Sequence, residues 1–174
     1  SDGCQDSTED MDDDNDGVSD VNDACSAYSS DLGWTSSSST DHDADGCQDV
    51  TEDTDDDNDG VIDSSDDCPT GNLGWVSTSS TDYDSDGCQD SSSEDPDDDN
   101  DGLSDNADNC PTGDLGWTSV ATTDYDSDGC QDSTEDMDDD NDGVSDVNDA
   151  CSAYSSDLGW TSVATTDYDS DGCQ

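Results

Sequence analysis

The sequence predicts an irregular, loop-rich tandem-repeat fold with little regular secondary structure. Three observations lead to this prediction: the composition, a repeat of about 42 residues, and two acidic loop motifs within the repeat. The chain has 174 residues, 53 of them acidic, with no Lys, Arg or Phe. Hydrophobic residues make up 25% of the chain and aromatic residues 5%, so an apolar core of ordinary size is not available.

The formal net charge of −53 excludes nucleic acid and anionic membrane as partners, because no cationic side chain offsets it. Composition by itself is typical of a disordered acidic chain. The nine Cys and four Trp are evenly spaced, however, and disordered acidic tails rarely carry either residue at regular intervals. The spacing therefore favours an ordered repeat over disorder.

The period is set by an Asp-Gly-Cys triplet, whose glycines are Gly3, Gly46, Gly87, Gly129 and Gly172. We expect repeat units at 1–40, 41–81, 82–123 and 124–166, with a further unit starting at 167–174. The sequence begins and ends inside a unit, without an initiator Met, a signal peptide, a hydrophobic span or a capping unit. We therefore expect it to be a window from a longer polymer.

The first loop motif contains the Asp-Gly-Cys triplet and is called the DGC loop below. In the second unit Asp41, Asp43 and Asp45 take positions 1, 3 and 5 of the twelve-position EF-hand calcium loop. The carbonyl of Cys47 takes position 7, and Asp49 and Glu52 take positions 9 and 12. In the third unit an extra Ser moves Glu94 to position 13, so we expect an altered or weaker site there. The remaining candidate ligands of DGC loops are Asp82, Asp84, Asp86, Cys88, Asp90, Asp124, Asp126, Asp128, Cys130, Asp132 and Glu135.

The second motif begins with Asp-Asp-Asp-Asn-Asp-Gly and is called the DDDNDG loop. It occurs four times, at 12–23, 55–66, 97–108 and 138–149, and has Asp at position 12 in place of Glu. The candidate ligands at positions 1, 3, 5, 7, 9 and 12 are Asp12, Asp14, Asp16, Val18, Asp20, Asp23, Asp55, Asp57, Asp59, Val61, Asp63, Asp66, Asp97, Asp99, Asp101, Leu103, Asp105, Asp108, Asp138, Asp140, Asp142, Val144, Asp146 and Asp149.

Electrostatics makes a bound cation obligatory for such loops. Five carboxylates around one point form ten like-charge pairs, each costing about 1 kcal/mol at roughly 4 Å in water, or on the order of 10 kcal/mol per empty loop. Calcium is favoured over magnesium because six or seven oxygens on flexible side chains suit its larger shell. Zinc and copper are disfavoured, since the only histidine, His42, stands where other units have Tyr. We expect about two calcium ions per repeat.

Flanking EF-hand helices have no room in this chain, because only Asp53 and Thr54 separate Glu52 of one loop from Asp55 of the next. The loops must therefore be stacked directly, with ions in place of a core. Seven divalent ions would leave most of the charge of −53 uncompensated. We therefore also expect shared ions, a dense counterion layer, or additional cations at positions such as Asp56.

The run DNDGLSDNADNCPTGDLGW, followed by DYDSDGC, resembles thrombospondin type 3 repeats. The resemblance covers about half to two-thirds of each unit. It implies an extracellular chain that winds around a string of calcium ions as a rod, with disulfides joining adjacent turns. It also implies metal roles for the aspartates named above. The Cys at position 7 of the DGC loop and the Ser/Thr stretch after the Trp depart from the family pattern.

The nine cysteines indicate an oxidising compartment. Neighbouring cysteines have two possible pairings, one across the metal loops and one across the Leu-Gly-Trp segment. The second closes the stretch that metal restrains least, and the resemblance also favours it. It implies that Cys4 pairs outside this sequence or is a free thiol, and that the disulfides are Cys25–Cys47, Cys68–Cys88, Cys110–Cys130 and Cys151–Cys173.

The Leu-Gly-Trp segments are the only concentrated apolar material, and we expect each Trp to cover a disulfide or an adjoining unit. The Ser/Thr stretches 35–40, 77–81 and 118–123 are interpreted as linker edges, with O-linked glycans as the alternative. The chain offers no catalytic base or nucleophile arrangement, so an enzyme is not expected.

The functional hypothesis is a structural extracellular filament or stalk, rigidified by calcium and either self-associating or continuing as a longer polymer. Two alternatives stay open: a calcium reservoir or mineral-interacting protein, and an adhesive module that binds carbohydrate through the Leu-Gly-Trp face.

Overall fold

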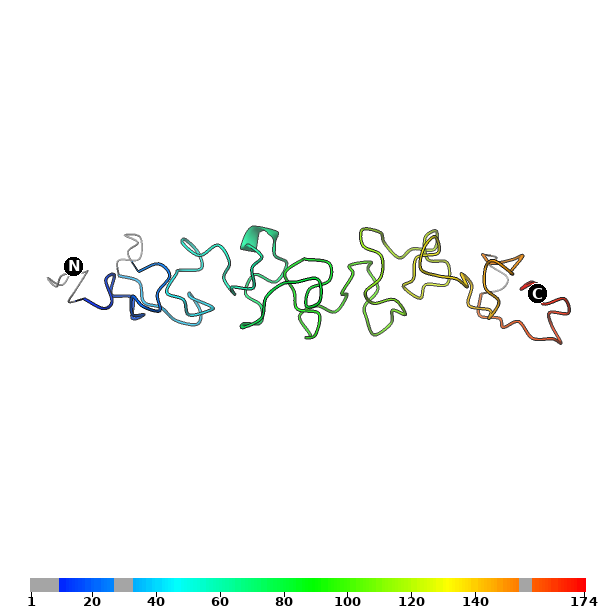
Figure 1. The fold of residues 1–174 in the computed structure, drawn as a ribbon, viewed down its shortest axis with the longest axis horizontal. Coiled ribbons are helices and arrows are strands. Elements are labelled where there is room, and N and C mark those ends of the chain that lie inside the picture. Colours follow the sequence, from blue (N-terminus) through cyan, green and yellow to red (C-terminus); the bar gives the residue numbers. More distant parts are fainter. Residues whose placement is uncertain (1–9, 27–32, 154–157) are drawn as a thin grey trace. The chain divides into compact units, whose positions relative to one another are not determined.

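The computed structural model describes residues 10–26, 33–153 and 158–174. Across these ranges the only helix or strand is η1, a single 3-10 turn at Asp63–Ser65. All other described segments are turns, bends and irregular loops (Figure 1). The predicted loop-rich fold with little regular secondary structure is confirmed. Asp side chains accept hydrogen bonds from nearby backbone N–H groups in every described loop, and this competes with helix and sheet formation.

The chain divides into two compact units, Ser1–Glu94 and Asp95–Gln174. The division falls just after Glu94 of a DGC loop and just before the DDDNDG loop that begins at Asp97. Each unit therefore contains both kinds of loop. The repeat boundaries expected from the sequence stay predictions.

The two loop types bend at the same two positions. Position 4 has a left-handed backbone in both, with φ of 56° at Asn58 and 63° at Ala44. Position 6 is a glycine with positive φ, 101° at Gly60 and 89° at Gly46. Asn and Gly tolerate this conformation better than other residues do. The same backbone thus turns the side chains of positions 1, 3 and 5 toward a common centre.

Backbone hydrogen bonds join a DDDNDG loop to the segment that follows it. The carbonyl of Asp59 at position 5 accepts the N–H of Ser77 at 2.9 Å, just after the Trp. The N–H of Asp67 donates to the carbonyl of Asp86 in the next DGC loop at 2.8 Å. The same two contacts recur once per repeat, as Ser36–Asp16, Ser119–Asp101, Ser162–Asp142, Ala24–Asp45, Asn109–Asp128 and Ala150–Asp171. Each DDDNDG loop is therefore fixed against the DGC loop that follows it.

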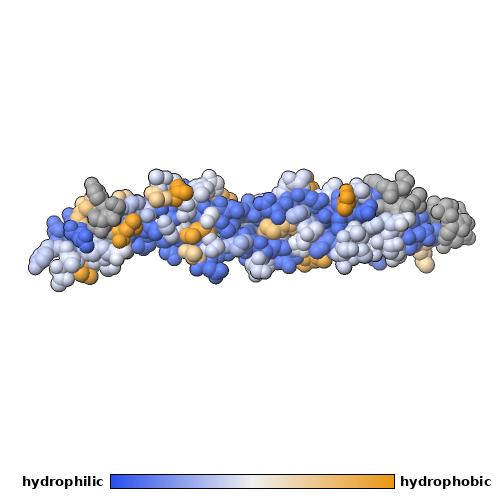
Figure 2. Space-filling view, turned by 180° about the vertical axis from the view of Figure 1, so that it is seen from behind, coloured by the Kyte–Doolittle hydropathy of each residue, from blue (hydrophilic) through white to orange (hydrophobic). Residues whose placement is uncertain are grey.

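The interior of the described chain consists mainly of carboxylates. Its only buried apolar residues are Cys25, Cys47, Cys88 and Cys130. Large apolar side chains such as Val21 and Val147 are exposed, at 89% and 90%. On the face shown in Figure 2, hydrophobic residues form small separate spots on a mostly hydrophilic surface. The buried aspartates are Asp14, Asp16, Asp23, Asp41, Asp57, Asp59, Asp66, Asp82, Asp95, Asp99, Asp101, Asp108, Asp124, Asp140, Asp142 and Asp167.

Four disulfides join each DDDNDG loop to the DGC loop after it. They are Cys25–Cys47, Cys68–Cys88, Cys110–Cys130 and Cys151–Cys173, with sequence separations of 20 to 22 residues. The predicted pairing across the Leu-Gly-Trp segment is confirmed. Cys4 lies outside the described residues, so its pairing stays a prediction. In the part of the chain that the structure describes, no helix has the length and apolar character needed to cross a membrane.

Candidate metal centres

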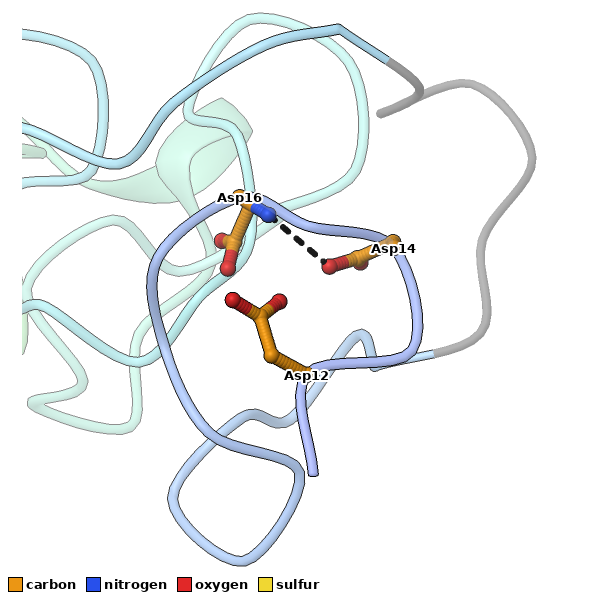
Figure 3. A group of neighbouring side chains, drawn as sticks. All are labelled: Asp12, Asp14 and Asp16. Carbon is orange, nitrogen blue, oxygen red and sulfur yellow. Dashed lines mark hydrogen bonds between the residues drawn. The ribbon is translucent and has the colours of Figure 1, made fainter. Parts of the chain in front are cut away.

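Carboxylates at positions 1, 3 and 5 converge inside single loops. In the first DDDNDG loop, Asp12, Asp14 and Asp16 point into the ring formed by their own backbone (Figure 3). One ligand atom from each lies within 4.8 Å of the other two. The same closeness holds for Asp41, Asp43 and Asp45, for Asp55, Asp57 and Asp59, and for Asp82, Asp84 and Asp86. Such triads could hold a metal ion.

The equivalent positions of the remaining loops are close enough to interact electrostatically. Burial, and then the charges of Asp99 and Asp97, raise the pKa of Asp101. Burial, and then the charge of Asp128, raise the pKa of Asp126 to about 6. Like charges brought together away from water favour either a proton or a cation.

The position-9 carboxylate accepts a hydrogen bond from the backbone N–H of position 2, seven residues earlier; this hydrogen bond is called the position-9 brace below. One carboxylate oxygen of Asp63 accepts the N–H of Asp56 at position 2, at 2.9 Å. Asp49 accepts the N–H of His42 in the same way at 3.0 Å. This oxygen therefore closes the ring by a hydrogen bond in both loop types. The other five braces are Asp13–Asp20, Tyr83–Asp90, Asp98–Asp105, Tyr125–Asp132 and Asp139–Asp146.

Position 12 of the DDDNDG loop lies at the junction between loops. Asp66 Oδ1 accepts the N–H of Cys68 at 2.6 Å, and a side chain on Gly87 of the next DGC loop would overlap this carboxylate. Burial raises the pKa of Asp66 to about 6, with smaller contributions from Asp57 and Asp59 of its own loop. The charge of Asp66 therefore interacts with its own triad, and its carboxylate lies against the following loop. Asp23, Asp108 and Asp149 contact Gly46, Gly129 and Gly172 equivalently.

Two DGC-loop glutamates, Glu94 and Glu135, lie against the turn that follows the preceding DDDNDG loop. Glu94 accepts the N–H of Asn72 at 2.7 Å and its side-chain amide at 2.9 Å. Glu135 lies against Gly113 in the equivalent turn of the preceding repeat. Despite the extra Ser of the third unit, the carboxylate of Glu94 therefore lies beside Gly71, in the turn equivalent to the one that Glu135 contacts. Its expected effect on metal binding stays a prediction.

A further acidic group lies between consecutive loops. Asp49, Asp53 and Asp56 bring ligand atoms within 4.8 Å of one another. Burial, and then Asp63, Asp49 and Asp53, raise the pKa of Asp56 to about 7. Asp139 has its pKa raised to about 7 by burial and by Asp146, Asp132 and Asp136. The EF-hand spacing assigns no ligand role to Asp53 or Asp56, and only the excess of acidic residues in the sequence hinted at this group.

The other residues singled out in the sequence have mostly structural contacts. A ring nitrogen of His42 hydrogen-bonds the carbonyl of Gly71 at 2.9 Å. Trp34, Trp75 and Trp117 are half-buried, and the indole N–H of each is buried without a hydrogen-bond partner. The expectation that each Trp covers a disulfide or an adjoining unit stays a prediction.

Comparison with protein-family models gives no match, and comparison with curated proteins gives none either. The resemblance to thrombospondin type 3 repeats therefore rests on the loop motifs alone, and no family is assigned. The structure supports repeated acidic segments, Asp triads that could hold metal ions, and four disulfides, which indicate an oxidising compartment.

Proposed function

We propose that this chain is part of a structural extracellular filament or stalk whose tandem loops are rigidified by calcium. The proposed mechanism is electrostatic. Ions bridge carboxylates along the chain and convert a self-repelling polymer into a stiff one, while disulfides fix each pair of successive loops.

The observation that carries the proposal is the carboxylate interior. Asp59, Asp101 and Asp142 are fully buried, at 0% exposure, and no Lys or Arg exists to pair with them. Buried charges are retained in proteins when they are paired or when they coordinate a metal. A chain with this interior needs cations in order to stay compact at neutral pH.

Calcium is the cation that fits the donor set best. Each triad offers hard oxygens on Asp side chains, and the loop spacing adds a backbone carbonyl at position 7. Cysteine sulfur is excluded as a ligand at Cys25, Cys47, Cys68 and Cys88, because these residues form disulfides. Zinc and copper sites would need the soft or imidazole ligands that these triads lack.

Disulfide formation and calcium loading both suit the extracellular space, where calcium is abundant and thiols are oxidised. We extend the proposal to continuation of the repeat as a longer polymer or to self-association. O-linked glycans on the exposed hydroxyls of Ser79 and Ser80 would be compatible with it.

Small-angle scattering and circular dichroism of the oxidised chain, in excess calcium and in excess chelator, test the proposal. The expected result is a smaller radius of gyration and a distinct spectrum in calcium. Identical profiles in the two conditions would contradict a calcium-rigidified structure. Calorimetric titration distinguishes the filament proposal from the reservoir alternative. The filament proposal predicts saturation near one ion per loop, whereas the reservoir alternative predicts weak, non-saturating binding.

A further inference from the structure

The two loop types differ in what their buried oxygens contact. In the DDDNDG loop 55–66, buried oxygens at positions 1, 5 and 12 have no hydrogen-bond partner: Asp55 Oδ1, Asp59 Oδ2 and Asp66 Oδ2. Asp59 is 0% exposed and Asp66 is 7% exposed. The same three positions lack partners in loop 97–108, at Asp97 Oδ1, Asp101 Oδ2 and Asp108 Oδ2.

The described DGC-loop aspartates have no buried oxygen without a hydrogen-bond partner. Protein donors engage them. Asp82 Oδ2 accepts the hydroxyl of Ser77 and the N–H of Gly87, and its Oδ1 accepts the N–H of Asp86. Asp43 Oδ2 accepts the side-chain amide of Asn58, which belongs to the following DDDNDG loop. These carboxylates are therefore stabilised by the protein before any ion arrives.

The position-12 carboxylates reinforce this difference. Asp66 lies close enough to Asp57 and Asp59 of its own loop for their charges to interact with it. Glu94, which the extra Ser places at position 13 of the following DGC loop, accepts hydrogen bonds from the backbone and side chain of Asn72. In loop 55–66 the charge of a fourth carboxylate therefore interacts with the triad, whereas Glu94 has hydrogen-bond donors outside its triad.

We propose that the chain has two classes of calcium site that fill in order, the DDDNDG loops tightly and first, and the DGC loops weakly and afterwards. This rests on the proposed calcium-binding function and deepens it. An ion in loop 55–66 supplies the only partner of three buried oxygens, so binding removes the whole penalty of leaving them unsatisfied. In a DGC loop, both oxygens of the position-1 aspartates Asp41 and Asp82 already accept hydrogen bonds, so an ion there removes less of this penalty. Because each unsatisfied charged group is costly, the classes should differ at least about tenfold in Kd.

The ordering gives the polymer a graded response. Asp66 and Asp108 contact Gly87 and Gly129 of the following DGC loops. Filling the tight sites therefore fixes the junctions between loops, and the weak sites then complete the loops at higher calcium. Partial depletion should empty DGC loops while the junctions persist.

The test compares Asp59→Asn with Asp45→Asn in the full oxidised chain. Both residues occupy position 5 of a loop in the same compact unit. The Oδ1 of each accepts a backbone N–H two residues later, at 2.7 Å from Val61 and at 2.8 Å from Cys47. Asn keeps this acceptor and replaces only the second oxygen. Calcium alone is titrated calorimetrically, and disulfide mapping by mass spectrometry verifies that each variant has the native pairing.

The expected wild-type isotherm has two classes of site. Asp59→Asn should remove one tight equivalent, and Asp45→Asn should leave the tight class intact and reduce the weak class by one. Saturable binding with a single class, or loss of a tight equivalent in Asp45→Asn, would overturn the ordering and leave the calcium function standing. Absence of saturable binding would overturn both.

Discussion

Loops 41–52 and 55–66 have the same ligand spacing, the same left-handed residue at position 4 and the same position-9 brace, yet their carboxylates have different partners. In the DGC loop, Asp41 Oδ2 accepts the hydroxyl of Ser36 and the N–H of Gly46. In the DDDNDG loop, Asp55 Oδ2 accepts only the N–H of Gly60, and its Oδ1 is buried without a partner. A shared motif therefore sets the geometry of a site, and neighbouring segments set how strongly it needs an ion.

DDDNDG loops also differ among themselves, according to the turn that follows them. Where that turn is Cys-Pro-Thr-Gly, the glycine N–H donates to position 3, from Gly71 to Asp57 at 2.9 Å and from Gly113 to Asp99 at 2.7 Å. The loop at 138–149 is followed by Cys-Ser-Ala-Tyr, and Asp140 Oδ2 is buried without a partner. Burial, and then the charge of Asp142, raise its pKa to about 6. One turn sequence thus changes the number of unpartnered oxygens in a site.

The largest expected effect is that of pH on the calcium-free chain. Burial raises the pKa of Asp56 and Asp139 to about 7 and that of Asp66 and Asp108 to about 6, from 3.8. A raised pKa in the compact state stabilises that state below the unfolded pKa, and the stabilisation is lost as pH rises through the folded pKa. In chelator, the compact chain should therefore be most stable near pH 4 and should expand as pH rises through 6 to 7.

Scattering measured across this pH range, with chelator and with saturating calcium, checks the prediction. Calcium should abolish the expansion at pH 7, because the ion takes the place of the proton. A calcium-free chain that is most compact at pH 8 would show that the buried carboxylates do not control compaction.

Gly87→Ala should destabilise the junction between the two loop types by about 4 kcal/mol. The new methyl group would overlap the carboxylate of Asp66, and Ala is also strained at a φ of +90°. Gly74→Ala is the matched control, because its φ is +83° and no atom lies within 4 Å of the added carbon. The control should lose only about 1 kcal/mol. Denaturant unfolding in saturating calcium, followed by Trp fluorescence, measures the free energy of unfolding of both variants. Equal losses of stability would show that the contact between Asp66 and Gly87 does not stabilise the junction.

Replacing both Cys68 and Cys88 by Ser should lower the free energy of unfolding by about 3 kcal/mol, since the disulfide closes a loop with a sequence separation of 20 residues. The substitution should also weaken calcium binding by loop 55–66, because Asp66 accepts the N–H of Cys68 and contacts the loop that contains Cys88. Calorimetric titration beside denaturant unfolding separates the two effects. A stability loss with unchanged tight sites would mean that the ion holds the junction without the disulfide.

Ser77→Ala should cost about 1 kcal/mol, because Asp82 loses one hydroxyl donor and keeps its backbone donors. Ser79→Ala, at an exposed hydroxyl three residues before Asp82, is the control and should be neutral. The weak calcium class should gain affinity in Ser77→Ala, since an ion no longer shares the oxygen with a hydroxyl. A change confined to the tight class would contradict the assignment of this donor to the DGC sites.

Much of the fold and of the candidate site could be predicted because the information is local. The absence of an apolar core and the Asp-x-Asp-x-Asp-Gly spacing determine the loops, since Gly at position 6 and short Asp side chains suffice to form the ring. The disulfide pairing also needed the resemblance, because spacing alone left two pairings open. The position-9 brace was not predicted, since a ligand position does not reveal that one of its oxygens accepts a backbone N–H.

Contacts between loops were the part that sequence could not supply. Asn58 belongs to one loop by sequence and donates to Asp43 of another, and Glu94 lies next to Asn72, 22 residues away. The group of Asp49, Asp53 and Asp56 forms only because two successive loops approach each other. Each of these contacts depends on how the chain folds back between motifs.

The sequence by itself determined that this protein is a repeat of acidic loops, because composition rules out an apolar core and each motif encodes its own turn. The tertiary structure decided which carboxylates are satisfied and which are not. Hydrogen-bond donors such as Ser77, Asn58 and Gly71 reach aspartates of other segments only after folding. The cost of a buried carboxylate depends on those donors, so two loops with one motif become two different sites.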